Sequence, residues 1–415
     1  MSRYYRLLLP ESSRMDQSNA SPPSRGAGLL LIAAIFALAL NLRPAMAAVG
    51  PLLDLIEATT GMDSTTASLL TTLPVAMIGV GALSIRPLRR RLGERMGILL
   101  GAVLIALACL ARWPFSSAGG LILSAVVVGV GVALIQALAP VVIKRAFPTR
   151  FGTVMGVYTT GIMGGAAVAA ATAAGFAEAF GWAVALALWS VPALVAAVVW
   201  LIASRAPAAE EPNRLAVVEG TDPEVPFWKQ PRAWALVPIL GLGTSAYTLV
   251  LAWLPPYYVD MGQARATAGF LLSGMTSAEV LAGVLVSLFI ARFPDRRGPM
   301  LLAVALALIG LAGLVLTPVS LAVPVMLLLG LGIGAVFPLT LILAMDQIDD
   351  PVRSGDLLAF VQGGGYIIAS LSPLAAGLLR DRLSDLSQAW MLMGLGLLVM
   401  AAMTLTFRPG GAKLR

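Results

Sequence analysis

The stretch AGLLLIAAIFALALNLRPAMAAVGPLL, residues 27–53, decides the class of this chain. It is apolar almost throughout and exceeds the ~20 residues that an α-helix needs to cross a bilayer. The whole chain shares this character: 59% of its 415 residues are hydrophobic and only 12% are charged. Soluble domains carry about a quarter charged residues. We therefore predict an all-α membrane protein that crosses the bilayer many times.

Twelve apolar segments are predicted to be transmembrane helices. They lie at residues 27–53, 64–86, 96–113, 118–143, 150–177, 181–204, 232–258, 265–291, 298–317, 320–345, 355–379 and 388–407. All but five of the 28 Lys and Arg residues fall on the side of the two termini; the others are Arg43 and the opposite-loop residues Arg112, Arg265, Arg380 and Arg382. Basic loops stay in the cytoplasm. This pattern predicts both termini in the cytoplasm. The Ala, Gly and Arg usage favours a bacterial cytoplasmic membrane.

The helices divide into two groups of six. We expect a tail at 1–26, bundles at 27–204 and 232–408, a polar Pro-rich linker at 205–231, and a tail at 409–415. An offset of about 200 residues aligns the bundles, so that Gly129-Val130-Gly131 falls on Gly330-Leu331-Gly332. Two parallel six-helix repeats around a central cavity resemble the major facilitator superfamily, whose substrate sites lie near the midplane.

Arg43 lies near the middle of the first predicted helix, two residues after Asn41. A charge at the bilayer centre costs about 2.5–3.5 kcal/mol or more, so such residues usually face a substrate, a partner or a wet cavity. We expect Arg43 and Asn41 to bind substrate. The alternative is that Arg43 holds helix-end carbonyls or a structural carboxylate. A guanidinium favours a ligand with negative charge or strong acceptor oxygens.

Glu279 is the deep carboxylate of the eighth predicted helix. Three roles remain open for it. It carries a coupling proton, because burial disfavours the charged form of a carboxyl group; it is the counter-ion of Arg43; or it is a neutral structural acid. Further candidates for the substrate site are two glutamines, which could instead bond neighbouring helices, and three tyrosines: Gln136, Gln362, Tyr158, Tyr247 and Tyr366.

Asp295-Arg296-Arg297-Gly298 lies between the eighth and ninth predicted helices. It resembles the end of the superfamily signature Gly-x-x-x-Asp-x-x-Gly-Arg-Arg, which latches the cytoplasmic side. The resemblance implies a latch role for Asp295, Arg296 and Arg297. The corresponding loop at residues 86–93 lacks the Asp, which puts its latch role in doubt.

Asn41-Leu42-Arg43-Pro44, with the Val49–Leu53 stretch and residues 61–74, resembles the cyanate/2-nitroimidazole transporter family of this superfamily. The resemblance implies a permease for a small anion or a small polar heterocycle, in either direction. We expect secondary active transport by alternating access of a small anion such as cyanate, coupled to protons. The alternative is efflux of 2-nitroimidazole-like or other small drug-like compounds.

Several other classes of function are disfavoured. The chain has no His and a single Cys, Cys109, so the usual zinc site is not expected. No paired catalytic carboxylates or cofactor motif occur at one depth, and no enzyme activity or cofactor is expected. The basic residues are scattered through short loops, which is not the pattern of a nucleic-acid-binding face. Expected partners are the substrate, protons and the lipid bilayer, with the protein acting as a monomer.

Overall fold

The computed structural model describes residues 25–205, 226–348, 351–383 and 385–408, and only the backbone of residues 25, 85–90 and 351–352. The predicted tails at 1–26 and 409–415, and most of the 205–231 linker, lie outside the described residues. Within the described part, twelve helical spans are long and apolar enough to cross a membrane. The predicted all-α class with twelve transmembrane helices is therefore confirmed.

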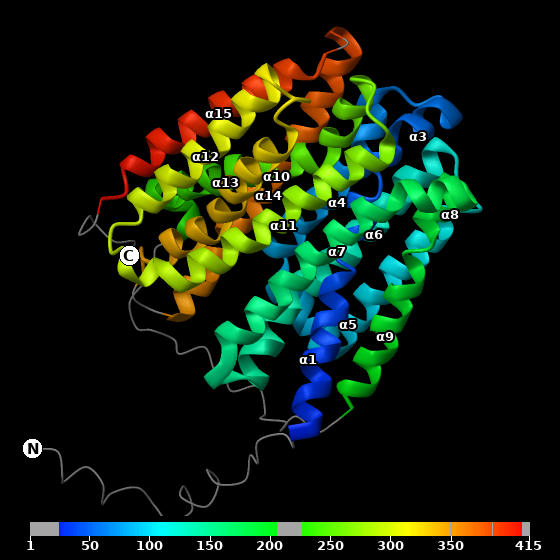
Figure 1. Cartoon of the computed structure of the whole chain (residues 1–415). Coiled ribbons are helices and arrows are strands. Elements are labelled where there is room, and N and C mark those ends of the chain that lie inside the picture. The colour runs from blue at the N-terminus through cyan, green and yellow to red at the C-terminus, as the bar shows by residue number, and fades with distance from the viewer. Residues whose placement is uncertain (1–24, 206–225, 349–350, 384, 409–415) are drawn as a thin grey trace, which may run out of the picture.

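The first six spans form one bundle and the last six form another (Figure 1). The elements of the first bundle are α1 (Arg25–Leu40), α2 (Pro44–Ala47), η2 (Gly50–Leu52), α3 (Leu53–Thr60), α4 (Ser64–Leu83), α5 (Ile85–Ala111), α6 (Ala118–Ala146), η3 (Pro148–Arg150), α7 (Phe151–Phe180), α8 (Trp182–Ala187) and α9 (Ser190–Ala203). Those of the second are η4 (Phe227–Lys229), α10 (Pro231–Asp260), α11 (Arg265–Phe289), η5 (Ile290–Arg292), α12 (Arg297–Leu316), α13 (Ala322–Met345), α14 (Pro351–Leu383) and α15 (Ser387–Leu405).

The first span is not the continuous helix that the sequence analysis expects. It is interrupted between α1 and α2, and it then continues to Thr60, beyond the predicted end at residue 53. Pro44 contributes to the interruption because it has no backbone N–H to donate to Leu40. Arg43, the N-cap of α2, has φ −116° and ψ −23° and stays in the right-handed helical region. The break leaves Arg43 at the start of α2, buried between the two bundles.

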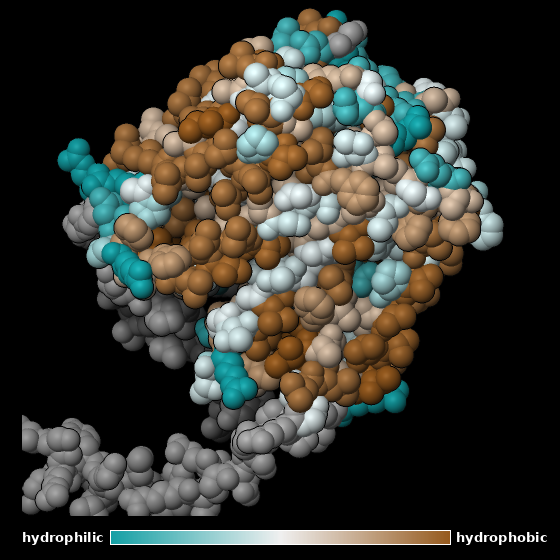
Figure 2. Space-filling model, in the orientation of Figure 1, coloured by the Kyte–Doolittle hydropathy of each residue, from teal (hydrophilic) through white to brown (hydrophobic). Residues whose placement is uncertain are grey.

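We call the side where α1 begins and α15 ends the terminal face, and the opposite side the distal face. The two bundles meet mainly where α4 packs along α14 and α7 along α11. Large apolar side chains are exposed on many helices, and Figure 2 shows them covering much of the molecule's flank. This surface is the one expected for a bundle whose surroundings are lipid.

Glycines allow some of these helices to approach closely, as small residues do in membrane bundles. A Cβ at Gly165 of α7 would collide with the backbone carbonyl of Leu40, where α1 ends. A Cβ at Gly334 of α13 would collide with the backbone of Glu279 on α11. These two contacts fix the positions of the broken end of α1 and of the helix that carries Glu279.

Candidate functional site

Arg43 is buried between the two bundles, with 3% of its surface exposed. Its Nε and Nη1 atoms have no hydrogen-bond partner. The guanidinium carbon lies 5.4 Å from the ring centroid of Tyr247, in cation–π geometry. Buried polar atoms are almost always hydrogen-bonded in proteins. Two nitrogen atoms without partners on a buried cation therefore mark a place where a ligand can bind.

Three tyrosines surround this guanidinium. Tyr247 lies on α10, Tyr366 on α14 and Tyr158 on α7, so both bundles contribute to the ring of phenols. The Tyr366 hydroxyl lies near the Arg43 guanidinium and interacts with it electrostatically. The hydroxyls of Tyr158 and Tyr247 are buried and have no partner. The structure thus brings together four of the predicted substrate-binding residues around one set of unused donors.

Glu279 faces the same region from α11. It is 4% exposed, and neither of its carboxyl oxygens has a hydrogen-bond partner. It interacts electrostatically with Tyr247 and Arg43 without forming a hydrogen bond to either. The direct counter-ion arrangement is therefore not adopted in this conformation. A protonated carboxyl group, which carries no charge, is better suited to so dry a place.

The remaining candidates differ in how they are placed. The amide nitrogen of Asn41 donates to the backbone carbonyls of Ala37 (2.8 Å) and Pro192 (3.1 Å). It thus ties the broken end of α1 to α9. The Oε1 atom of Gln136 on α6 is buried and has no partner. Gln362 on α14 is half-buried.

The three residues with a predicted latch role make contacts inside the second bundle. Arg297 pairs with Asp295 at 2.7 Å, and Arg296 pairs with Asp346, at the end of α13, at 2.8 Å. The hydrogen bonds from Arg297 hold the pKa of the exposed Asp295 carboxyl below its usual value. These pairs lie at the terminal face, and the contacts described for them do not reach the first bundle.

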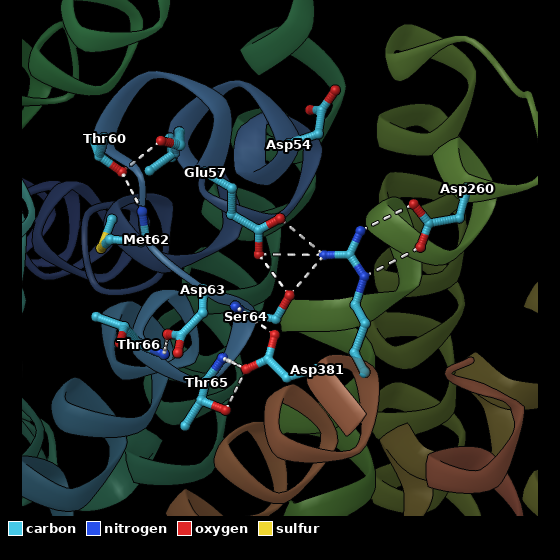
Figure 3. A network of polar contacts seen from close by, with 12 residues as sticks. Asp54, Glu57, Thr60, Met62, Asp63, Ser64, Thr65, Thr66, Asp260 and Asp381 are labelled. Atoms are coloured by element: carbon cyan, nitrogen blue, oxygen red, sulfur yellow. Dashed lines mark hydrogen bonds and ion pairs between the residues drawn. The ribbon is translucent and has the colours of Figure 1, made fainter. Parts of the chain in front are cut away.

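The distal face, in contrast, carries a polar network that joins the two bundles (Figure 3). Arg380 of α14 pairs with Glu57 of α3 at 3.0 Å and with Asp260 of α10 at 3.0 Å. Ser64, at the start of α4, donates to Glu57 at 2.9 Å and accepts from Arg380 at 3.2 Å. Arg380 thus connects carboxylates of both bundles.

Two further contacts complete this distal network. Arg265, at the start of α11, donates from Nε to the Asp54 carboxylate of α3 at 2.8 Å. Asp381 of α14 accepts from the backbone N–H groups of Ser64 (2.9 Å) and Thr65 (2.8 Å), which caps the start of α4. The distal face is therefore closed over the buried site. The sequence places Arg265 and Arg380 in the outer loops but does not predict their partners, because the contacts between the bundles join positions more than 200 residues apart.

Arg112 corrects a sequence-based assignment. Its position after an apolar segment and before Trp113-Pro114 placed it in an outer loop. In the structure it is 1% exposed and donates to Ser124 of α6 and to the carbonyl of Ala45 in α2. It therefore belongs to the surroundings of the helix break, not to the solvated loops.

The helix topology and the buried, two-sided site are those of a transporter that alternates access between two halves. Residues 29–373 match the Major Facilitator Superfamily, and the chain belongs to this family. It is 36% identical to the cyanate transport protein CynX of Escherichia coli K12, over 89% of this chain and 95% of that protein. It is also 29% identical to the 2-nitroimidazole transporter of the same organism, over 85% of this chain and 88% of that protein. The predicted resemblance to these transporters is confirmed.

Solved structures show the same fold. A D-xylose–proton symporter superposes with a TM-score of 0.70 at 17% identity, covering 92% of this chain and 98% of its own. A bacterial homologue of the human lysosomal transporter Spinster, in an inward-facing and occupied conformation, superposes with a TM-score of 0.71 at 17% identity, covering 93% and 97%. The chain is thus a multi-pass membrane protein with the fold of this superfamily.

Proposed function

We propose that this protein is a secondary active transporter that moves a small anion such as cyanate by alternating access, coupled to protons. The observation that carries the proposal is the buried guanidinium of Arg43, whose Nε and Nη1 atoms lack partners inside a ring of tyrosines. The named substrate of the 36% identical relative has the matching chemistry. The relatives are transporters, and no enzyme activity is proposed.

The anion would take up the unused donors. A guanidinium presents its N–H groups in a planar fork, and charge-assisted hydrogen bonds are about twice as strong as neutral ones. The partnerless hydroxyls of Tyr158 and Tyr247 would complete the shell around a small ligand. Asn41, Gln136, Gln362 and Tyr366 keep their proposed place in this site, Asn41 through its hold on the break in helix 1.

Glu279 would carry the coupled proton. It lies on α11 in the second bundle, whereas Arg43 belongs to the first. When the halves rock, the distance between this carboxyl group and the guanidinium changes, and with it the stabilisation of the ionised form. Substrate binding at Arg43 and proton binding at Glu279 would therefore influence one another, which is the requirement for coupling.

Uptake of labelled cyanate into proteoliposomes, with and without a proton gradient, tests the proposal. We expect gradient-stimulated uptake by the wild type, loss in Arg43→Ala, and poor recovery in Arg43→Lys because an ammonium lacks the planar fork. Correctly inserted wild-type protein that takes up no cyanate would contradict the proposal. An Arg43→Ala variant that fails to fold would instead support a structural role for this arginine.

A second candidate is efflux of 2-nitroimidazole-like compounds. It is favoured by the aromatic character of the site, where the ring centroids of Phe337 and Tyr366 lie 6.4 Å apart. It is also favoured by the named ligand of the 29% identical relative. A nitro group also presents acceptor oxygens to Arg43. Competition tests whether the two compounds share one site: cyanate should block binding of a labelled 2-nitroimidazole only if both use the guanidinium.

The setting proposed for this activity is a bacterial cytoplasmic membrane, with both termini in the cytoplasm and the protein acting as a monomer. The basic residues of the terminal face support this orientation, since positively charged loops remain in the cytoplasm. In that orientation the distal network seals the outer side. Asp295, Arg296 and Arg297 would then act as a latch at the cytoplasmic side. Protease protection of a C-terminal tag in sealed inside-out and right-side-out vesicles tests the orientation.

A further inference from the structure

We propose that Arg112 is a positioning residue for the anion site: it holds the broken backbone of helix 1 so that Arg43 is presented between the bundles. This inference rests on the proposed function only where transport is concerned, because the backbone effect can be measured without any substrate. Arg112 is distant in sequence from Arg43 and acts on it through its contact with α2.

The contacts of Arg112 are specific. Its Nε atom donates to the Ser124 hydroxyl at 3.0 Å, and its Nη1 atom donates to the Ala45 carbonyl at 2.7 Å. Ser124 in turn donates to the carbonyl of Leu121 at 2.7 Å, which leaves its oxygen free to accept from Arg112. Arg112 is thereby held between α6 and α2 with its fork fixed in direction.

The Ala45 carbonyl needs this donor because it lacks the backbone hydrogen bond that a continuous α-helix would provide. In a continuous α-helix the backbone N–H of Val49 would bond to Ala45. Here the N–H of Val49 donates to Met46 at 3.1 Å instead, as α2 ends and the chain turns into η2. A buried carbonyl without a donor destabilises the fold. Arg112 satisfies it at the point where the backbone itself cannot.

The arginine is present as a cation in a place without a matching carboxylate. Among the described residues no ion pair to Arg112 is formed, and its Nη2 atom has no partner. It lies at the C-terminal end of α5, where the partial negative charge of the helix favours a cation. The burial of this charge is therefore explained by the hydrogen bonds from Arg112 to Ser124 and Ala45, not by a salt bridge.

The contact between Arg112 and Ala45 lies close to Arg43 in the chain. Ala45 is two residues from Arg43, and the N–H of Ala47 bonds to the Arg43 carbonyl at 2.9 Å within the same short turn. A shift of α2 therefore moves the Arg43 backbone and the direction of its guanidinium. Geometry errors of about 1 Å far from a reacting group can reduce activity by ~100-fold in enzymes, and hydrogen bonds from a guanidinium to an anion also depend on direction.

Hydrogen–deuterium exchange and cyanate transport by the same purified variants test the inference. In Arg112→Ala we expect faster exchange confined to the segment from 41 to 53. We also expect a KM for cyanate raised by about tenfold or more, because a shift of α2 changes the direction of the Arg43 guanidinium, with a much smaller change in maximal rate. Arg112→Lys should recover part of both effects, because an ammonium can still donate to the Ala45 carbonyl but lacks the planar fork that reaches Ser124 as well. Ser124→Ala, which leaves the Ala45 bond, should have a smaller effect than Arg112→Ala.

Two results would overturn the inference. Unchanged exchange over 41–53 in Arg112→Ala would show that Arg112 does not hold the break. Faster exchange spread over all helices, with KM unchanged, would make Arg112 a general stabiliser of the fold. If the wild type transports no cyanate, the proposed function fails, while the exchange measurement still decides the role of Arg112.

Discussion

Among single residues, Arg43 and Tyr247 form the most informative pair, because the ring offers the cation an attractive face without neutralising it. A carboxylate in the same position would occupy the guanidinium and compete with an anionic ligand. The cation–π contact at 5.4 Å leaves Nε and Nη1 free. Such contacts contribute about 0.5–2 kcal/mol. The Arg43 guanidinium is thus charged and held in place, and it still has N–H groups without hydrogen-bond partners.

The Tyr247 ring and hydroxyl can be separated experimentally. Tyr247→Phe keeps the ring under Arg43 and removes one unused donor, so we expect KM for the anion to rise by about three- to tenfold, the value of one hydrogen bond. Tyr247→Ala removes both and should weaken binding further. Equal effects of the two substitutions in cyanate uptake would show that the hydroxyl, and not the ring, is the contributing group.

Glu279→Gln replaces the carboxyl group by an amide of similar shape that cannot carry a proton. We expect cyanate exchange across a membrane without a gradient to be retained and stimulation by a proton gradient to be lost. Glu178→Gln, at an exposed carboxylate near the end of α7, is the matched control. Retained stimulation in Glu279→Gln would remove this residue from proton coupling.

Arg43 and Glu279 could be found from the sequence because each is an isolated charge in an apolar segment. Arg112 could not, since a basic residue beside Trp113-Pro114 also fits a loop. Asn41 was expected at the ligand, but its amide nitrogen bonds to Pro192 of α9, a contact that only the packed bundle creates. The sequence shows where a polar residue interrupts an apolar segment. Which residue it bonds to depends on how the helices pack against one another.

At the scale of elements, the break in the first span determines the site. Pro44 interrupts the helix, and Gly165 lets α7 approach the carbonyl of Leu40 at the broken end. The sequence predicted the span and its twelve-helix context, but it did not predict the interruption. Proline within an apolar run is compatible with a kink, a break or an ordinary transmembrane helix. The choice depends on neighbours such as α7 and α9.

Pro44→Ala tests the value of the break. It restores a backbone N–H and removes the clash with the preceding turn, so the first span can become more regular. We expect a protein that folds and inserts but whose KM for cyanate rises by about tenfold or more, because Arg43 changes direction. Pro74→Ala, at a proline inside α4, is the control. Wild-type transport by Pro44→Ala would show that the break is not needed.

At the scale of the whole molecule, the structure closes the distal face with contacts between the bundles. Arg380 and Arg265 come from the second bundle, and their partners Glu57 and Asp54 come from the first. The predicted twofold repeat is visible in the fold, but these contacts do not follow from it. They depend on the relative tilt of the halves, which one conformation adopts and another does not.

Arg380→Ala should open the distal face more often. A cysteine introduced at Thr244, a buried residue of α10, reports this in a Cys109→Ser background. We expect a membrane-impermeant thiol reagent applied from the distal side to label it several-fold faster when Arg380 is replaced. Arg296→Ala, at the terminal face, is the control and should not increase distal labelling. Unchanged labelling in Arg380→Ala would show that other contacts keep this face closed.

The distal network also limits how much energy a transport cycle needs. Partly exposed ion pairs contribute only about 0–1 kcal/mol each, so the two pairs that join the bundles, Arg380–Glu57 and Arg265–Asp54, bias the protein by at most about 2 kcal/mol. That corresponds to roughly one molecule in thirty being open at this face. A ligand that prefers the open form by about 30-fold would equalise the two populations. Arg380 retains Asp260 of its own bundle when Glu57 moves away, so a reversal of access leaves that cation paired.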